Sequence, residues 1–262
     1  MRTNKKLIVT VIVCLILGVT ICITALILSG FDFGVLNTVK YETKTYETEE
    51  EFSAINIDVS TENIVFLPSE DGKCRVVSSE SEKIKHDIYV DENGTLNVTL
   101  NDSRKWYERL GFAFGAGDVT IYLPDKNYNS LTINVSTGDI TVTGVKSVGD
   151  VQVNVSTGRT EIKNVTCKNF ITDGSTGKVV LNNVIATEKF TIKRSTGDIK
   201  FQDCDAGEIS VKTSTGDVTG LLLSEKVFIT DTSTGKIDVP KSKSGGICEI
   251  TTSTGDIEIK IC

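Results

Sequence analysis

Residues 131–142 read LTINVSTGDITV and contain a Ser-Thr-Gly triplet that recurs through the second half of the chain. The triplets begin at Ser136, Ser156, Ser175, Ser195, Ser214, Ser233 and Ser253. Successive triplets are 20, 19, 20, 19, 19 and 20 residues apart. A spacing this regular over seven copies is typical of a stacked-repeat architecture.

Apolar and polar residues alternate on both sides of each triplet, which is the period of a strand with one buried face. Five residues before the serine, the repeats have Leu131, Val151, Phe170, Phe190, Ile209, Phe228 and Cys248. We therefore predict two strands per repeat, joined at the triplet by a corner whose glycine supplies a positive φ. The corner glycines are Gly138, Gly158, Gly177, Gly197, Gly216, Gly235 and Gly255.

The repeat length selects the architecture. About 20 residues is too short for a βαβ unit or a β-propeller blade, but it fits one coil of a β-solenoid. We expect an all-β fold, a parallel β-helix-like solenoid in which equivalent positions of successive coils stack at about 4.8 Å. In this arrangement Phe170, Phe190 and Ile209 lie above one another.

The N-terminal segment is predicted to be a single membrane-spanning helix. Leu7 to Leu28 contains 22 residues without a charge, enough to cross a hydrocarbon core of about 30 Å. Arg2, Lys5 and Lys6 precede it, so the positive-inside rule places the N-terminus in the cytoplasm and the remainder outside the cell. A cleaved signal peptide is the alternative, but no small-x-small cleavage site follows the apolar run.

The remaining boundaries follow from composition and period. We predict a cytoplasmic tail over 1–6, the transmembrane helix over 7–29, an acidic linker over 30–51, an irregular β region capping the solenoid over 52–130, and the regular S-T-G solenoid over 131–262. Within the cap, Asp91-Glu92-Asn93-Gly94 predicts a hairpin turn between strands near 85–90 and 95–100. Residues 60–63 and 115–118 read as degenerate coils. The last strand, ending at Cys262, has no predicted cover and leaves an edge open to pairing.

Charge and composition exclude several classes of function. The chain carries 28 Lys+Arg and 35 Asp+Glu, a net charge of −7, whereas a nucleic-acid binder needs a basic face. The 35 acidic residues all lie beyond residue 29 with 25 of the 28 cations, so residues 30–262 carry −10. A single histidine, His86, argues against histidine-based metal sites and histidine-dependent nucleophiles. We predict no cofactor, no metal and no catalytic residues.

Two sets of equivalent repeat positions could indicate a calcium site or a disulfide, but each has a simpler explanation. Three residues after each serine, the repeats have Asp139, Arg159, Lys178, Asp198, Asp217, Lys236 and Asp256. Four of the six successive pairs are opposite in sign, which indicates a charge ladder rather than a calcium cage. Cys204 and Cys262 share an apolar column but are three repeats apart, about 14 Å at 4.8 Å per coil, which is too far for a disulfide. The exported cysteines are interpreted as small buried hydrophobes.

One segment combines cations with aromatic side chains. It is a candidate contact patch for a glycan, a protein partner or a lipid headgroup, although packing of Trp106 over the solenoid end is the favoured interpretation. The patch residues are Arg104, Lys105, Trp106, Tyr107 and Arg109.

The S-T-G-D-I phrase at Ser136–Ile140, Ser195–Ile199 and Ser253–Ile257, with the opening Phe52–Ile57, resembles the bacterial putative-adhesin family of β-strand-repeat proteins, a domain of unknown function. The resemblance covers roughly 52–262 and implies a β-solenoid on a bacterial surface, with no family catalytic residues to transfer. We therefore expect a membrane-anchored, non-enzymatic adhesin or envelope scaffold that binds a surface glycan or a protein. The alternatives are an accessory or sensor of a cell-envelope stress response and, third, a polysaccharide-processing enzyme. The oligomeric state is left open.

Overall fold

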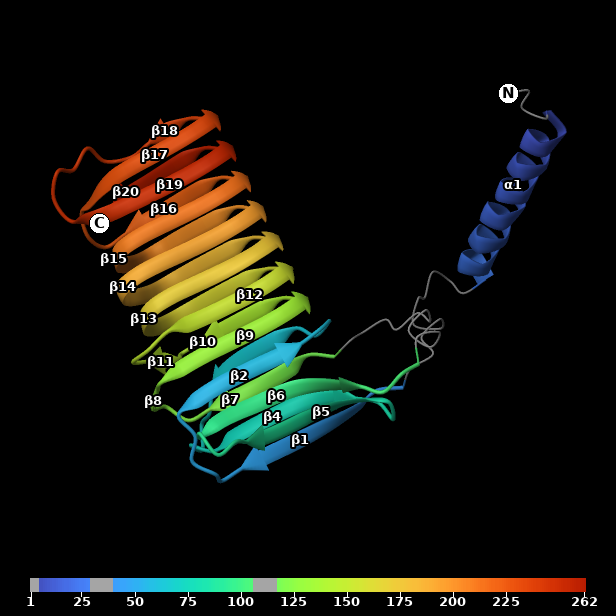
Figure 1. Ribbon diagram of the computed structural model, residues 1–262, viewed down its shortest axis with the longest axis horizontal. Helices are drawn as coiled ribbons and strands as arrows, with labels where there is room; N and C mark the ends of the chain where they lie inside the picture. The colour runs from blue at the N-terminus through green and yellow to red at the C-terminus, as the bar shows by residue number, and fades with distance from the viewer. Residues whose placement is uncertain (1–4, 29–39, 106–116) are drawn as a thin grey trace. The chain divides into compact units, whose positions relative to one another are not determined.

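The computed structural model describes residues 5–28, 40–105 and 117–262, which fall into two units (Figure 1). One unit contains the helix α1 (Lys5–Leu28). The other contains every strand of the described chain. These are β1 (Glu42–Thr48), β2 (Ala54–Val59), β3 (Ile64–Pro68), β4 (Cys74–Glu80), β5 (Ile84–Val90), β6 (Thr95–Asp102), β7 (Val119–Leu123), β8 (Asn127–Tyr128), β9 (Ser130–Thr137), β10 (Ile140–Thr143), β11 (Lys146–Ser147), β12 (Val151–Thr157), β13 (Thr160–Thr176), β14 (Val179–Thr196), β15 (Ile199–Thr215), β16 (Val218–Leu222), β17 (Lys226–Thr234), β18 (Ile237–Asp238), β19 (Gly246–Thr254) and β20 (Ile257–Ile261).

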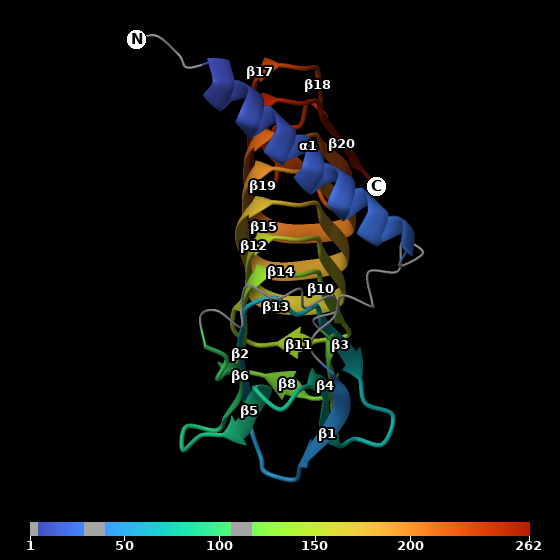
Figure 2. The same cartoon turned by 90° about the vertical axis from the view of Figure 1, so that its right-hand side faces the viewer.

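The strands wind into stacked coils with parallel pairing between neighbours, as Figures 1 and 2 show. All strands belong to one continuous sheet; the face made by the strands before each corner is called the first sheet here, and the face made by the strands after it the second sheet. The long strands β13, β14 and β15 bend and contribute to both sheets. Phe170 pairs with Phe190 and Phe190 with Ile209. The predicted stacking of equivalent residues in successive coils is therefore confirmed.

The core lies between the sheets and is built from the inward half of each alternating pattern. Phe170, Phe190 and Phe201 are almost completely buried. The rings of Phe170 and Phe190 meet edge to face at 5.9 Å, and those of Phe190 and Phe201 stack at 6.2 Å. Burying one such side chain contributes about 2 kcal/mol, so stacked files of apolar side chains supply most of the stabilisation.

The corners require glycine for two separate reasons. The triplet glycines have φ between 139° and 155°, a region that residues with a Cβ rarely adopt. Successive corners also approach closely, so that a Cβ on Gly158 would lie 1.9 Å from the carbonyl oxygen of Gly138. A side chain at a corner would therefore separate two neighbouring coils.

The coils do not stack in sequence order at either end. β19 and β20 lie between the coil of β15–β16 and the coil of β17–β18. At the other end, β2 and β3 lie between β6–β7 and β9–β10. The predicted open edge at the last strand is therefore wrong, since β17–β18 is the outermost coil (Figure 1). The error arose because all repeats share the same columns, so any coil can fit beside any other.

The N-terminal end is closed by antiparallel strands. β5 and β6 form the predicted hairpin across Asp91–Gly94, which is confirmed. β4 pairs with β7, and β1 pairs with β4 along its whole length. Residues 42–48 were predicted to lie in the acidic linker and instead form β1, because Tyr46 and Thr48 alternate inward against β4 while the glutamates stay in solvent.

The membrane span expected over 7–29 is not shown. In the part of the chain that the structure describes, no helix is both long enough and apolar enough to cross a membrane.

The altered coil order changes the distance between two cysteines. Cys204 pairs beside Leu222, and the Cys262 amide donates to the Leu222 carbonyl. The two cysteines are therefore two coils apart rather than three, about 10 Å at 4.8 Å per coil, which still exceeds the reach of a disulfide. Both are free thiols; Cys204 is buried and Cys262 is exposed.

The corner geometry predicts a large effect of a single methyl group. Gly177 has φ 139°, and its Cβ would lie 1.9 Å from the Gly158 carbonyl oxygen. We expect Gly177→Ala to lower the free energy of unfolding by about 2–4 kcal/mol, because backbone strain alone costs 1–3 kcal/mol. Thermal unfolding followed by circular dichroism measures this. Ser175→Ala, at an exposed position of the same corner, is the matched control and should change stability little; equal stability of both variants would contradict the explanation.

Candidate binding surface

A polar groove lies on the outer face of the first sheet, across β2, β9, β12 and β13. Its volume is about 580 Å³. We call it the polar groove, and its lining comprises Asp58, Val59, Asn134, Val135, Ser136, Gln152, Asn154, Val155, Ser156, Ile171, Asp173, Gly174 and Ser175. Four neighbouring coils therefore contribute to one continuous surface.

The strand register aligns the polar side chains of the groove. Asp58 pairs with Asn134, Asn134 with Asn154, and Asn154 with Asp173. The Nδ2 group of Asn154 donates a hydrogen bond of 2.8 Å to Oδ1 of Asn134. An amide can make up to four hydrogen bonds, so both side chains keep capacity for a ligand. The groove thus offers polar groups repeated at the spacing of the coils.

A buried guanidinium lies near one end of the polar groove. Arg194 is 4% exposed and pairs with Gly174 on the neighbouring strand. Its Nη2 donates to the hydroxyls of Thr160 and Thr172 at 3.0 and 2.9 Å, and its Nη1 donates to the Lys193 carbonyl at 3.0 Å. Burial lowers the pKa of Arg194 to about 10, and the negative charge of Asp173 opposes that shift.

The Arg194 environment is encoded by several breaks in the repeat. Thr160 and Thr172 replace aliphatic residues of their columns, and Gly174 stands where the two preceding repeats have valine. A Cβ on Gly174 would lie 2.6 Å from Nη1 of Arg194, so the missing side chain makes room for the guanidinium. The repeat pattern does not predict this cluster, although four exceptions to it in three adjacent repeats were the available signal.

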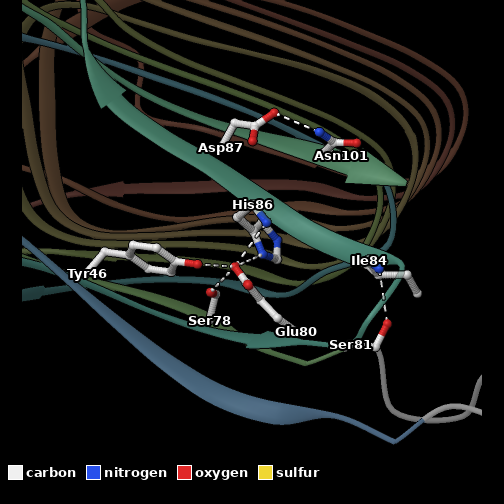
Figure 3. A network of polar contacts seen from close by, with 8 residues as sticks. All are labelled: Tyr46, Ser78, Glu80, Ser81, Ile84, His86, Asp87 and Asn101. Atoms are coloured by element: carbon white, nitrogen blue, oxygen red, sulfur yellow. Dashed lines mark hydrogen bonds and ion pairs between the residues drawn. The ribbon is translucent and has the colours of Figure 1, made fainter. Parts of the chain in front are cut away.

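A second polar cluster lies inside the N-terminal cap (Figure 3). Oε1 of Glu80 accepts hydrogen bonds from the Tyr46 hydroxyl at 2.9 Å, the Ser78 hydroxyl at 3.2 Å and the His86 amide at 3.0 Å. Nδ1 of His86 lies 3.5 Å from the same oxygen, and neither ring nitrogen has a hydrogen-bond partner within the described chain. Burial and the bond to Glu80 raise the pKa of Tyr46.

The cap cluster acts as a connection between strands. Tyr46 belongs to β1, Glu80 to β4 and His86 to β5, so one buried carboxylate holds three strands together. Glu80 and His86 are 5% and 4% exposed, which leaves a substrate no access to them. The only histidine of the chain is therefore placed as a structural residue.

The corner carboxylates accept hydrogen bonds from backbone amides of the neighbouring coil. Oδ1 of Asp139 accepts the Arg159 amide at 2.8 Å, and Oδ1 of Asp256 accepts the Lys236 amide at 2.7 Å. Because the coil order is inverted, Asp198, Asp217 and Asp256 are consecutive in space, so the predicted alternation of charge is weaker than expected. Among the residues that the structure describes, no group of three or more acidic, histidine or cysteine side chains is arranged to hold a metal ion.

The predicted contact patch is described only in part. Arg104 is half-buried and Lys105 is exposed, directly after β6. Trp106, Tyr107 and Arg109 lie outside the described residues. The patch therefore stays a prediction. The polar groove was not predicted from the sequence, because outward positions vary between repeats.

Comparisons with known proteins agree with the fold. A family model described as Toastrack DUF4097 matches residues 52–261. No curated protein matches the chain. A putative adhesin from Bacteroides fragilis has a similar structure, with a TM-score of 0.57 and 17% identity over 84% of this chain and 97% of that one. At this identity the similarity concerns the fold alone.

Two further solved structures are more distant. A putative lipid binding protein from Parabacteroides distasonis has a TM-score of 0.44 and 14% identity, covering 84% of this chain and 97% of that one. A putative adhesin from the same organism has a TM-score of 0.38 and 14% identity, covering 85% and 98%.

Replacing the buried Arg194 cluster should stabilise the protein. An isolated buried charge costs more than its hydrogen bonds return, and apolar replacements of buried ionic groups often stabilise by about 1–4 kcal/mol. We expect Arg194→Met combined with Thr160→Val and Thr172→Val to raise the free energy of unfolding by that amount in urea titrations. Arg194→Met alone should gain less, because it leaves the hydroxyls of Thr160 and Thr172 unpaired. A triple variant less stable than the wild type would show that the charge is needed for folding.

Proposed function

The chain belongs to the Toastrack DUF4097 family, and from this membership we propose that it is a non-enzymatic surface adhesin or envelope scaffold that binds its ligand in the polar groove. The observation that carries the proposal is the alignment of Asn134 and Asn154 on neighbouring coils. Such an array suits an extended molecule with repeated hydroxyl or amide groups, since each coil repeats the same kind of contact.

The proposed ligand is a surface glycan, with an extended protein segment as the alternative. Asparagine and glutamine side chains both donate and accept hydrogen bonds, as sugar hydroxyls and peptide groups require. Asp58 and Asp173 at opposite ends of the file, together with the charge of −10 over residues 30–262, disfavour an acidic polymer. We therefore propose a neutral or cationic chain.

The spacing of carboxylates supports binding over hydrolysis. Asp58 and Asp173 are separated by Asn134 and Asn154, which is three coil steps or about 14 Å. Glycoside hydrolases hold their two carboxylates about 5–9.5 Å apart. A polysaccharide-processing enzyme is therefore the weakest of the three candidate functions.

We also propose that the N-terminal segment anchors the protein in the cell membrane, with the N-terminus cytoplasmic and the strand unit extracellular. The support is the 22-residue uncharged stretch behind Arg2, Lys5 and Lys6. Apolar side chains in α1 are exposed, for example Leu15 at 64% and Ile21 at 65%, and apolar surface of this extent needs an apolar environment.

A sensor or accessory of an envelope stress response is the second candidate. The observation that favours it is the position of β1, the first strand after the anchor segment, which the Tyr46–Glu80 bond ties to the cap. A signal at the strand unit would reach the membrane through this strand.

Removing the aligned amides should weaken adhesion. We expect cells displaying the full chain with Asn134→Ala and Asn154→Ala to bind coatings of cell-wall glycan or extracellular-matrix protein at least fivefold less than wild-type cells. Thr191→Ala with Ser210→Ala is the matched control, because both residues lie on the same sheet outside the groove. Unchanged binding of the asparagine variant at equal surface display would rule out the groove.

The anchor is tested by fractionation. We expect the full chain to stay in the membrane pellet after alkaline carbonate extraction, and external protease to digest the strand unit on intact cells. Val11→Arg with Leu15→Arg should release it, since each charge costs about 2.5–3.5 kcal/mol within a bilayer. Recovery of the wild-type protein in the supernatant would contradict the anchor.

A further inference from the structure

Lys226 is the most deeply buried lysine among those described. Its side chain is 4% exposed, whereas the lysines of the other ion pairs are at least 33% exposed. Nζ of Lys226 lies 2.6 Å from Oδ1 of Asp205 and contacts the hydroxyl of Ser224. The Ser224 hydroxyl in turn donates to the same carboxylate oxygen at 2.8 Å. The three side chains form a closed cluster.

The cluster lies where the coil order is inverted. Lys226 begins β17 and pairs with Gly246, the first residue of the inserted β19. A Cβ on Gly246 would lie 1.7 Å from the Gly207 carbonyl oxygen, so the main chain is tightly packed here. Asp205 belongs to β15, which lies on the other side of β19. The contact between Lys226 and Asp205 therefore spans the inserted coil.

We infer that Lys226 and Asp205 become joined by an intramolecular isopeptide bond between Nζ and the side-chain carboxyl carbon. First, a proton passes from the ammonium of Lys226 to the carboxylate of Asp205, giving an amine and a carboxylic acid. The amine lone pair then attacks the carboxyl carbon and forms the C–N bond. The Ser224 hydroxyl accepts a proton from the nitrogen and passes one to the departing hydroxyl group. The C–O bond breaks and one water molecule leaves, so no oxidant, reductant or other reactant is needed.

Position and burial favour this reaction at Lys226. Well-oriented groups held in contact reach effective molarities of about 10⁵–10⁸ M. The Lys226 side chain is 4% exposed and that of Asp205 is 26% exposed, so Nζ approaches the carboxyl group with little solvent between them. A pocket of about 450 Å³ opens beside the cluster and is lined by Asp205, Ser224 and Lys226, which gives the released water a way out.

A second Lys–Asp ion pair in the chain has a similar separation but is exposed to solvent. Nζ of Lys146 lies 2.7 Å from Oδ1 of Asp125, almost the same separation, but the two side chains are 52% and 70% exposed. Water stabilises both charges there, so Lys146 and Asp125 remain an ordinary ion pair. Burial, rather than distance, distinguishes the two sites.

Intact mass spectrometry of the denatured full-length chain tests the inference. We expect the protein to be lighter than its sequence by the mass of one water molecule, and tryptic digestion to yield a branched peptide joining Asp205 to Lys226. Trypsin should fail to cut after Lys226 but should cut normally after Lys146. A mass equal to that of the sequence, with complete cleavage after Lys226, would overturn the inference.

Two variants exclude other losses of water. Asp205→Asn should still cross-link but lose ammonia instead of water, because the amide nitrogen becomes the leaving group. Lys226→Arg should keep the full sequence mass, since a guanidinium does not form this bond. Persistence of the water loss in Lys226→Arg would assign it to another reaction, such as cyclisation at Asp205, and would contradict the cross-link.

Discussion

The close approach of the main chain at each corner is the constraint on which the remaining structure depends. Where the Gly158 backbone passes the Gly138 carbonyl there is no space for a side chain. Because the corners stack without an obstruction, the strands on both sides stay in register over successive coils. This register brings Phe170 above Phe190 in the core, and it brings Asn134 beside Asn154 on the outer face. Core and binding surface are two consequences of one repeated backbone geometry.

The sequence predicted the strands, corners and core residues within each coil, but not the order in which the coils stack. Alternation around the triplets placed Phe190 inside, and the turn sequence Asp91–Gly94 placed the hairpin, because both features depend on residues close in the chain. The positions of β19 and β2 depend on pairing between distant segments. Since every repeat presents the same columns, local pattern does not distinguish one order of coils from another. β1 was missed for a different reason: its glutamates suggested a solvated linker, while its inward face contains only Tyr46 and Thr48.

The candidate site was less predictable than the fold. Inward positions are restricted by packing and therefore repeat, whereas outward positions such as Gln152 and Asp173 vary freely, so a binding surface leaves no periodic signal. The buried polar groups were detectable in principle. Thr160, Thr172 and Arg194 each break a column, and such local conflicts with the global pattern mark places where another requirement is met. The Lys226 cluster breaks no apolar column, and only the three-dimensional structure shows its burial.

The interleaved order of coils has a mechanical consequence. In a solenoid stacked in sequence, tension on the C-terminus peels off the outermost coil, one ladder of hydrogen bonds at a time. Here residues 248–258 pair with a neighbouring coil on each side, so a pull on Cys262 first breaks one ladder at the end of β20 and must then shear two ladders at once. The same holds for residues 54–68 at the opposite end. Each inserted segment is therefore held by two ladders, whereas edge strands such as β1 and β17 are held by one.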